Sequence, residues 1–279
     1  MPEIALIDRA VIKVSGRDAE RLLQDTLTAR IAPDLEGTGR WFALLSPQGK
    51  ILAEGLVSRA EGAFWFDLPK AAKDDFLKRM RLYKLRAEVE LEDKTGQKLV
   101  GWSRASPGEG VTFPDRREAS LGYRVIAPEA EARQWDGDAT RFEAARVKAG
   151  IAELGADFAP DQQFPHDIGM DLLGGVDFEK GCFVGQEVVS RMQHRGAARR
   201  RPVVVKGQAR LTQGADLRCG GRVVGTVTSV AGKAGLAIAR IDRVSDPLDC
   251  LAGDVPASLE LPSWASYGFS ASSGNGDSA

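Results

Sequence analysis

The sequence predicts an α+β protein that ends in a small β-barrel, and three observations support this. Up to residue 102, strand-like apolar runs and amphipathic helical segments follow one another in groups, as in α+β layers. No G-x-G-x-x-G or Walker-type loop opens a helix, so the usual nucleotide sites of doubly wound sheets are absent. From Pro202 on, short β-type runs alternate with Gly-containing turns, which is typical of a barrel.

The first hundred residues contain two predicted helices among strands. Apolar residues recur at helical spacing over 18–27 and 70–83, with charged residues on the outer face. Ser46-Pro47-Gln48-Gly49-Lys50 has the composition of a turn, because Pro fixes φ and Gly tolerates positive φ. The predicted strands are 4–7, 10–14, 41–45, 51–57, 63–68, 87–91 and 97–102.

The rest of the chain divides into a second subdomain and the barrel. Residues 103–115 are rich in Ser, Pro and Gly and mark the expected boundary. A strand at 121–126 and a helix at 139–149, capped by Gly150, precede a long irregular segment at 155–175, and such segments tend to be functional. The predicted barrel strands are 203–206, 215–219, 222–230 and 236–241.

Length and patterning set the expected domains and location. We expect a domain at 1–200 with subdomains at about 1–115 and 116–200, a barrel at 201–262 and a disordered tail at 263–279. No apolar run approaches the roughly 18 to 20 residues that span a bilayer. The first residues resemble neither a signal peptide nor a transit peptide. The expected location is therefore the cytoplasm, without membrane contact.

The cysteine and histidine counts limit the possible cross-links and metal sites. Cys182, Cys219 and Cys250 are odd in number and far apart, which argues against a disulfide framework and for a reducing compartment. We expect Cys219 and Cys250 to be ordinary packed residues. Only His166 and His194 are present and no C-x2-C spacing occurs, so no built-in metal site is expected. His166 and the neighbouring Asp167 are interpreted as structural.

The stretch around Cys182 carries the strongest chemical signal. Cys182 lies between Gly181 and Gly185, two residues after Lys180 and shortly before a predicted helix start. An ammonium and a helix N-terminus both favour a thiolate, so we expect the pKa of this thiol to lie below its free value of about 8.5. The alternative is a small buried cysteine in a tight turn. The pair Gln186-Glu187 that follows favours a functional thiol.

A block of positive charge follows the same stretch. No acidic residue occurs between Glu187 and Asp216. The net charge of −1 makes any polyanion site local, and this block suits an anion such as phosphate, RNA or a polyglutamate tail. The alternatives are a solvated linker for the block and simple helix support for the Glu187–Arg191 pair. The block comprises Arg191, Arg195, Arg199, Arg200, Arg201, Lys206 and Arg210.

Residues 180–187, Lys-Gly-Cys-Phe-Val-Gly-Gln-Glu, resemble the K-G-C-[YF]-x-G-Q-E signature of YgfZ-type folate-binding proteins, with every fixed position present. These proteins are relatives of the glycine-cleavage aminomethyltransferases and support iron-sulfur cluster maturation. The resemblance covers about residues 4 to 260. Further matching segments are Val14-Ser15-Gly16-x-Asp18-Ala19, Leu22-Leu23-Gln24, Ser46-Pro47-Gln48-Gly49-Lys50, Leu82-Tyr83-Lys84-Leu85-Arg86, Arg146-x-x-x-Gly150-Ile151 and Leu172-Leu173-Gly174-Gly175-Val176.

The resemblance implies a cloverleaf of two α+β subdomains and a C-terminal β-barrel around a central channel for tetrahydrofolate. It implies that Cys182 and Lys180 are the working residues of this channel. Lysine replaces the acidic residue of the relatives' R-x-E-A-G motif at Lys148, and lysine cannot accept the pterin's amino protons. The residues expected around the cofactor are Tyr83, Arg86, Arg146, Gln186, Glu187 and Arg191.

Three functions remain as hypotheses at this point. The leading one is a folate-binding accessory factor for iron-sulfur cluster assembly or repair, which acts with iron-sulfur proteins or cluster carriers. Because a cluster normally takes four thiolates, Cys182 alone cannot hold one. The second is a tetrahydrofolate-dependent aminomethyl or one-carbon transferase, against which Lys148 argues. The third is a tRNA-modification-linked module that binds RNA through the block from Arg191 to Arg210. Whether the chain turns over a substrate stays open.

Overall fold

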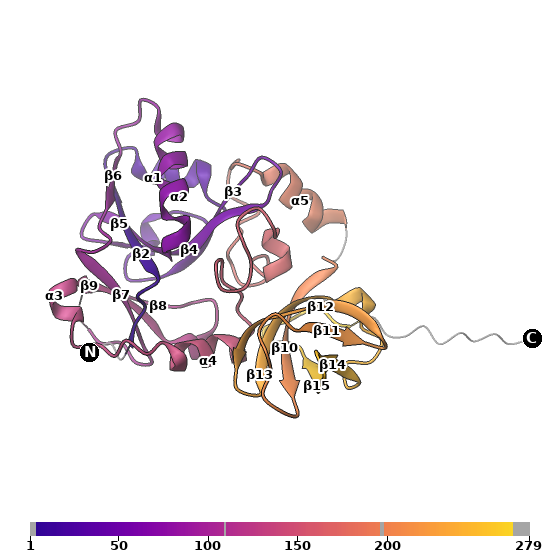
Figure 1. Cartoon of the computed structure of the whole chain (residues 1–279). Helices are drawn as coiled ribbons and strands as arrows, with labels where there is room; N and C mark the ends of the chain where they lie inside the picture. The colour runs from indigo at the N-terminus through magenta and orange to yellow at the C-terminus, as the bar shows by residue number, and fades with distance from the viewer. Residues whose placement is uncertain (1–3, 109, 196–197, 270–279) are drawn as a thin grey trace, which may run out of the picture.

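The computed structural model describes residues 4–108, 110–195 and 198–269, which form two β-sheets with helices and one closed barrel (Figure 1). The first sheet has the strand order β3-β4-β5-β2-β6, all neighbours antiparallel. Helices α1 (Ala19–Thr26) and α2 (Lys70–Lys84) pack beside it. Its strands are β2 (Arg9–Ser15), β3 (Arg40–Leu45), β4 (Ile51–Ala60), β5 (Ala63–Pro69) and β6 (Glu90–Asp93).

An aromatic cluster joins this sheet to α2. The rings of Phe42 and Phe66 lie edge to face with centroids 5.1 Å apart, and Phe76 of α2 lies 5.6 Å from Phe66. All three side chains are fully buried. Edge-to-face pairs of this kind stabilise a core beyond the area that they bury. The amphipathic pattern that predicted α2 therefore corresponds to a real buried face.

The second sheet corrects the expected subdomain boundary. Its strand order is β1-β7-β9-β8, so the chain's first strand pairs with β7, where Ile4 lies opposite Trp102. A boundary near residue 115 would assign three of these four strands to the wrong subdomain. Hydrophobic periodicity identifies strands but not their distant partners, so the sequence did not reveal this exchange. The strands are β1 (Ile4–Ala5), β7 (Lys98–Ser103), β8 (Val111–Pro114) and β9 (Tyr123–Pro128).

The C-terminal part is a closed barrel, as the sequence predicts, but it has six strands where the sequence predicted four. Its order is β10-β13-β12-β11-β14-β15, and α4 (Thr140–Ala149) packs against it. Helix α3 (Glu129–Ala132) lies by the second sheet, and α5 (Gln186–Arg195) immediately precedes the barrel (Figure 1). The strands are β10 (Arg200–Gly207), β11 (Asp216–Cys219), β12 (Arg222–Ala231), β13 (Ala234–Arg240), β14 (Cys250–Ala252) and β15 (Val255–Glu260).

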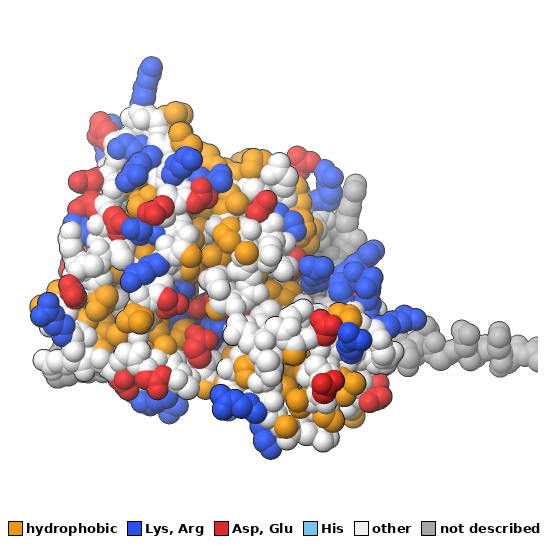
Figure 2. Space-filling model, in the orientation of Figure 1, with side chains coloured by type: hydrophobic (Ala, Val, Ile, Leu, Met, Phe, Trp, Pro, Cys, Tyr) orange, Lys and Arg blue, Asp and Glu red, His pale blue; other side chains and the backbone are white. Residues whose placement is uncertain are grey.

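The distribution of charge over the surface is uneven. Figure 2 shows acidic and basic side chains mixed over the two-sheet part of the visible face. Lys and Arg side chains gather between α5 and the barrel (Figure 2).

Short 3₁₀ turns complete the described fold at Pro33–Leu35, Ala119–Leu121, Pro165–Ile168 and Ile241–Arg243. No helix among the described residues is long and apolar enough to cross a bilayer.

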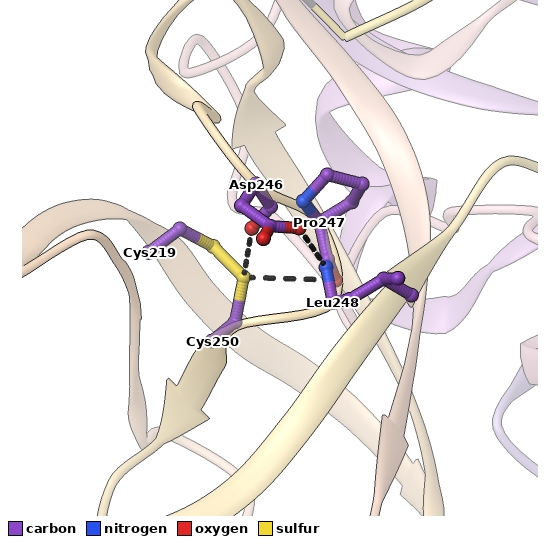
Figure 3. Close-up of a disulfide and its surroundings, with 5 residues drawn as sticks. All are labelled: Cys219, Asp246, Pro247, Leu248 and Cys250. Carbon is purple, nitrogen blue, oxygen red and sulfur yellow. Dashed lines mark hydrogen bonds between the residues drawn. A yellow bond between two sulfur atoms is a disulfide. The ribbon is translucent and has the colours of Figure 1, made fainter. Parts of the chain in front are cut away.

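Cys219 and Cys250 form a disulfide, which contradicts the expectation that the chain has none (Figure 3). The two residues lie directly opposite each other on the neighbouring strands β11 and β14, with Cα atoms 4.3 Å apart. The Cys250 sulfur lies 3.4 Å from the carbonyl oxygen of Asp246. Parity and spacing could not reveal this pair, because barrel closure brings together residues 31 positions apart. Cys182 is the remaining free cysteine.

Part of the segment expected to be disordered, residues 263–269, is held by the rest of the fold. The indole N–H of Trp264 donates to the Ala149 carbonyl at 2.8 Å, and the Tyr267 hydroxyl donates to the Pro202 carbonyl at 2.7 Å. Gly169 makes room for the indole, since a Cβ there would lie 2.5 Å from the Trp264 ring. Residues 263–269 are therefore packed, and 270–279 lie outside the described residues. The Ser- and Gly-rich composition predicted disorder, although Trp264 and Tyr267 in this segment form hydrogen bonds with the rest of the fold.

Buried ion pairs join the two sheets. The Asp67 carboxylate of the first sheet accepts hydrogen bonds from Arg9 at 2.5 Å and from Arg124 of the second sheet at 3.0 Å. Arg117 bridges Asp115 and Glu153, each at 2.7 Å. Burial alone would raise the pKa of Glu153, but the guanidinium groups around it outweigh this and hold its pKa well below the usual range.

We predict that Arg124→Met lowers the free energy of unfolding by about 3–5 kcal/mol, because it leaves Asp67 and Asp115 with fewer partners in a fully buried place. Urea denaturation measures this. The matched control is Arg79→Met, which removes the partly exposed Arg79–Asp75 pair on α2 and should cost less than about 1 kcal/mol. Equal stability of the two variants would contradict a structural role for the network.

Candidate functional site

The segment that carries Cys182 is tied to the loop after α1. The Asp177 N–H donates to the Thr28 carbonyl at 3.0 Å. The Asp177 carboxylate accepts from the N–H groups of Glu179 and Lys180 at 2.8 and 2.9 Å, and from Arg30 at 2.5 Å. These bonds hold the pKa of Asp177 below its ordinary value, although burial opposes this. Aspartate thus closes a local turn and fixes it to a distant loop.

Lys180 is a buried anchor in this segment. Its ammonium donates to the carbonyl oxygens of Leu27 at 2.5 Å and Ala29 at 2.8 Å, and lies 5.2 Å from the centre of the Phe183 ring. Burial lowers the pKa of Lys180 to about 8, although the Asp177 carboxylate opposes the shift. None of the hydrogen bonds of Lys180 joins it to the Cys182 thiol. The residue therefore positions the loop.

Two glycines let the helix after Cys182 pack onto the Ser46–Lys50 turn. Gly185 has a φ of 80° and Gly49 a φ of 78°, values that favour glycine. A Cβ on Gly185 would lie 2.6 Å from the Ser46 carbonyl oxygen, and one on Gly49 would lie 3.0 Å from the Val188 Cβ. The two motifs of the predicted resemblance, far apart in sequence, are therefore in contact. This contact fixes where α5 begins.

Cys182 is exposed, whereas Phe183 beside it is buried. Gln186 is half-buried in the first turn of α5, and the exposed Glu187 accepts a hydrogen bond from Arg191 at 2.5 Å. The thiol is thus presented on a loop with buried supports on both sides. The interpretation of Cys182 as a small buried cysteine is wrong.

The remaining predicted site residues lie elsewhere. Tyr83 is half-buried and Arg86 exposed at the end of α2, while α4 and α5 occupy other parts of the molecule (Figure 1). Arg146 of α4 is fully buried, and its guanidinium is bonded to Glu143, Asp157 and the Ser229 hydroxyl. Lys180 and Gln186 flank Cys182 in the chain, and no hydrogen bond or ion pair among the described residues joins this segment to Tyr83, Arg86 or Arg146.

Three further residues named from the sequence, Lys148, His166 and Arg201, lie in different surroundings. Lys148 is exposed on the outer side of α4. His166 is buried, and its Nε2 lies 3.1 Å from the Gln193 side chain, which fits a structural role. Arg201, within the basic block, is buried and paired with Asp171 at 2.6 Å. The residues that the structure describes contain no group of three or more His, Cys, Asp or Glu that could hold a metal.

Sequence reasoning missed the residues that support the thiol. The sequence did not single out Asp177, Thr28 or Arg30. Asp177 had a recognisable signal, because an aspartate whose carboxylate accepts the N–H groups two and three residues later forms a known turn. Gly49 was assigned only to a turn. Its close approach to the Val188 side chain of α5 leaves no trace in one sequence, because the two residues are far apart in the chain.

The protein's relatives can now be compared with this geometry. The chain is 31% identical to the iron-sulfur cluster assembly factor IBA57 homolog, mitochondrial, of Pyricularia oryzae, over 92% of this chain and 75% of the relative. The chain belongs to this family of iron-sulfur cluster assembly factors. The Chaetomium globosum relative of the same name is 32% identical over 70% of the chain, which spans 54% of that relative's length. The family model of the CAF17 C-terminal β-barrel domain matches residues 199–267.

A solved structure confirms the expected fold. The glycine cleavage system aminomethyltransferase T of Bartonella henselae superposes with a TM-score of 0.72 over 95% of this chain and 86% of its own, at 18% identity. An aminomethyltransferase-like fold with a C-terminal barrel is therefore confirmed, and so is the placement among iron-sulfur cluster assembly factors. The narrower YgfZ-type assignment stays a prediction. The expected cytoplasmic location is wrong, because the relatives carry the description mitochondrial.

We predict that Gly185→Ala lowers the free energy of unfolding by about 1–3 kcal/mol, because its Cβ would collide with the Ser46 carbonyl and its φ is positive. The displaced loop should also change the rate at which a thiol reagent labels Cys182. Gly181→Ala is the matched control next to the same cysteine, since its Cβ would meet no atom within 4 Å. If the control disturbs labelling as much as Gly185→Ala, the contact with the Ser46–Lys50 turn does not position the thiol.

Proposed function

We propose that this chain is an accessory factor in iron-sulfur cluster assembly or repair, and that Cys182 contacts a cluster held mainly by a partner. The observation that carries the proposal is an exposed thiol on a loop anchored by Lys180 and Asp177, in a chain related to cluster assembly factors. A loop fixed in this way presents its sulfur to a docking protein without reorganisation. Such preorganisation lowers the entropic cost of a transient contact.

The other thiol sulfurs of the chain are not available for a cluster. Cys219 and Cys250 are buried and joined in the barrel. Because iron-sulfur clusters are usually held by four thiolates, the missing ligands must come from another molecule. The proposed partners are therefore iron-sulfur proteins or cluster carriers. Cys182 then acts as one ligand in a shared site, and the cluster leaves when thiolates of an acceptor protein replace Cys182 and the donor's ligands on the iron atoms.

Tetrahydrofolate binding rests on the fold alone. Of the residues expected to hold it, Arg146 is fully engaged by buried partners, and no hydrogen bond or ion pair among the described residues joins Tyr83 or Arg86 to the segment of Cys182. Lys148, in place of the relatives' acid, faces outward. These residues do not fit the cofactor as the resemblance implied, so no step of the proposed function passes through folate. The transferase alternative loses support for the same reason.

The RNA-binding alternative has weak support from the basic block. Arg201 is buried and paired with Asp171, and Arg191 is paired with Glu187. Lys206 lies 3.5 Å from Glu260. Within the block, Arg199 and Arg200 keep exposed side chains without an ion pair among the described residues. We therefore do not adopt RNA binding as a second function.

We predict that Cys182→Ala abolishes the ability of the purified chain to accelerate cluster delivery to a [4Fe-4S]-dependent apoenzyme, measured as recovered enzyme activity. The thiol is the only sulfur of the loop at residues 177–185, and thiolates are the usual ligands of iron-sulfur clusters, so the rate should fall to that without the protein. The double variant Cys219→Ala/Cys250→Ala, which keeps the exposed thiol, is the control and should remain active if it folds. Unchanged delivery by Cys182→Ala would refute the proposed role of the thiol.

A further inference from the structure

A groove runs along α5 beside the first barrel strand. It is a hollow of about 710 Å³ on the flank of the helix that follows Cys182. Its apolar side chains are Phe164, Val188, Met192 and Ala198. Val188 and Met192 are one helical turn apart, so a single face of α5 lines the groove. None of the functional residues proposed above needs this apolar surface, which leaves it open to another molecule.

Five cationic side chains surround the apolar surface, and Figure 2 shows Lys and Arg gathered in this region. Arg191 and Arg240 have carboxylate partners in Glu187 and Asp242. The guanidinium groups of Arg199 and Arg200 form no ion pair or side-chain hydrogen bond with the described residues. The fifth cation is Lys50.

Among the described residues of the lining, one carboxyl group, Asp167, stands against the five cations and interacts with Lys50 and Arg200. Asp167 is buried, and this burial raises the pKa of its carboxyl. Its carboxylate already accepts the N–H of Phe164 at 3.0 Å. The groove therefore has an excess of positive charge beside apolar side chains. Such a surface attracts an anion that also carries apolar groups.

The groove continues over the barrel. A second hollow of about 380 Å³ shares Arg200 and Arg240 with the first and adds Arg243. Arg200 and Arg240 lie directly opposite each other on β10 and β13. Like charges in that position destabilise a sheet, and Asp242 offsets only one of the two. An anionic ligand that crosses from one hollow to the other would remove this repulsion.

The side chains that line the groove favour one kind of anion over others. Single-stranded nucleic acid needs open aromatic faces on which bases stack, but the ammonium of Lys50 lies 3.6 Å above the Phe164 ring and covers it. A compact anion would occupy one hollow and leave the other unused. An extended polypeptide fits both, because its alternate side chains can reach the apolar surface and the arginines in turn.

We propose that the groove between α5 and the barrel docks an extended acidic segment of a partner protein, with apolar side chains between its acidic ones. The inference rests on the proposed function for the partner's identity as a cluster carrier or client. A segment seated against Val188 and Met192 lies along the helix whose preceding loop carries Cys182. Docking therefore holds the partner beside the thiol while the cluster is shared.

The test measures binding of a fluorescent peptide of about ten residues that alternates Glu and Leu and spans about 30 Å when extended. Fluorescence anisotropy with the full chain should show binding that weakens as salt rises. The double variant Arg199→Gln/Arg200→Gln should weaken binding about tenfold. Lys148→Gln/Arg104→Gln removes two exposed charges at a different hollow and should leave the affinity unchanged.

Two further variants separate this inference from the role of the thiol. Met192→Gln should weaken peptide binding with little change in its salt dependence, because it removes apolar contact only. Cys182→Ala should bind the peptide like the wild type even if it delivers no cluster. If the wild type accelerates no cluster delivery but still binds the peptide, the proposed function is refuted and the docking site stands.

Several outcomes would overturn the docking proposal. One is equal affinity of wild type and Arg199→Gln/Arg200→Gln for the peptide. Another is equal binding of a control peptide that alternates Lys and Leu. Tighter binding of an oligouridine RNA, lost in the same double variant, would assign the groove to nucleic acid instead. If the Glu-Leu peptide competes with cluster delivery by the wild type, docking and delivery are linked as proposed.

Discussion

The fold depends on burying arginine and carboxylate groups together where its parts meet. Asp67 of the first sheet is shared between Arg9 and Arg124, and Arg146 of α4 is bonded to Asp157 and to Ser229 of the barrel. A buried charge is tolerated only with partners in good geometry, so each ion pair fixes the relative position of the elements that supply it. The two sheets and the barrel are thereby held in one arrangement.

That arrangement also bears on where function can lie. Every guanidinium nitrogen of Arg146 forms a hydrogen bond within the chain, so this residue has a structural role. The free thiol instead lies on a surface loop, held by Lys180 and Asp177. A function that needs contact with another protein suits an exposed thiol better than an enclosed reaction would. This is the physical reason for favouring an accessory factor over a transferase.

The sequence predicted local features well and distant partners poorly. Periodicity located α2 and four of the six barrel strands. It could not show that β1 joins the second sheet, that Cys219 pairs with Cys250, or that Lys180 bonds to the loop after α1. Each of these contacts joins residues far apart in the chain, and spacing carries no information about them.

The Ser46–Lys50 turn links the two surfaces that we assign to partner contact. Gly49 packs against Val188 and Gly185, which fixes the start of α5 and so the loop of Cys182. The next residue, Lys50, donates to the Gln162 carbonyl at 2.8 Å and lines the groove on the flank of the same helix. One turn therefore supports both the thiol and a wall of the groove. A partner that engages the groove presses on the element that positions Cys182, so docking and thiol placement cannot be independent.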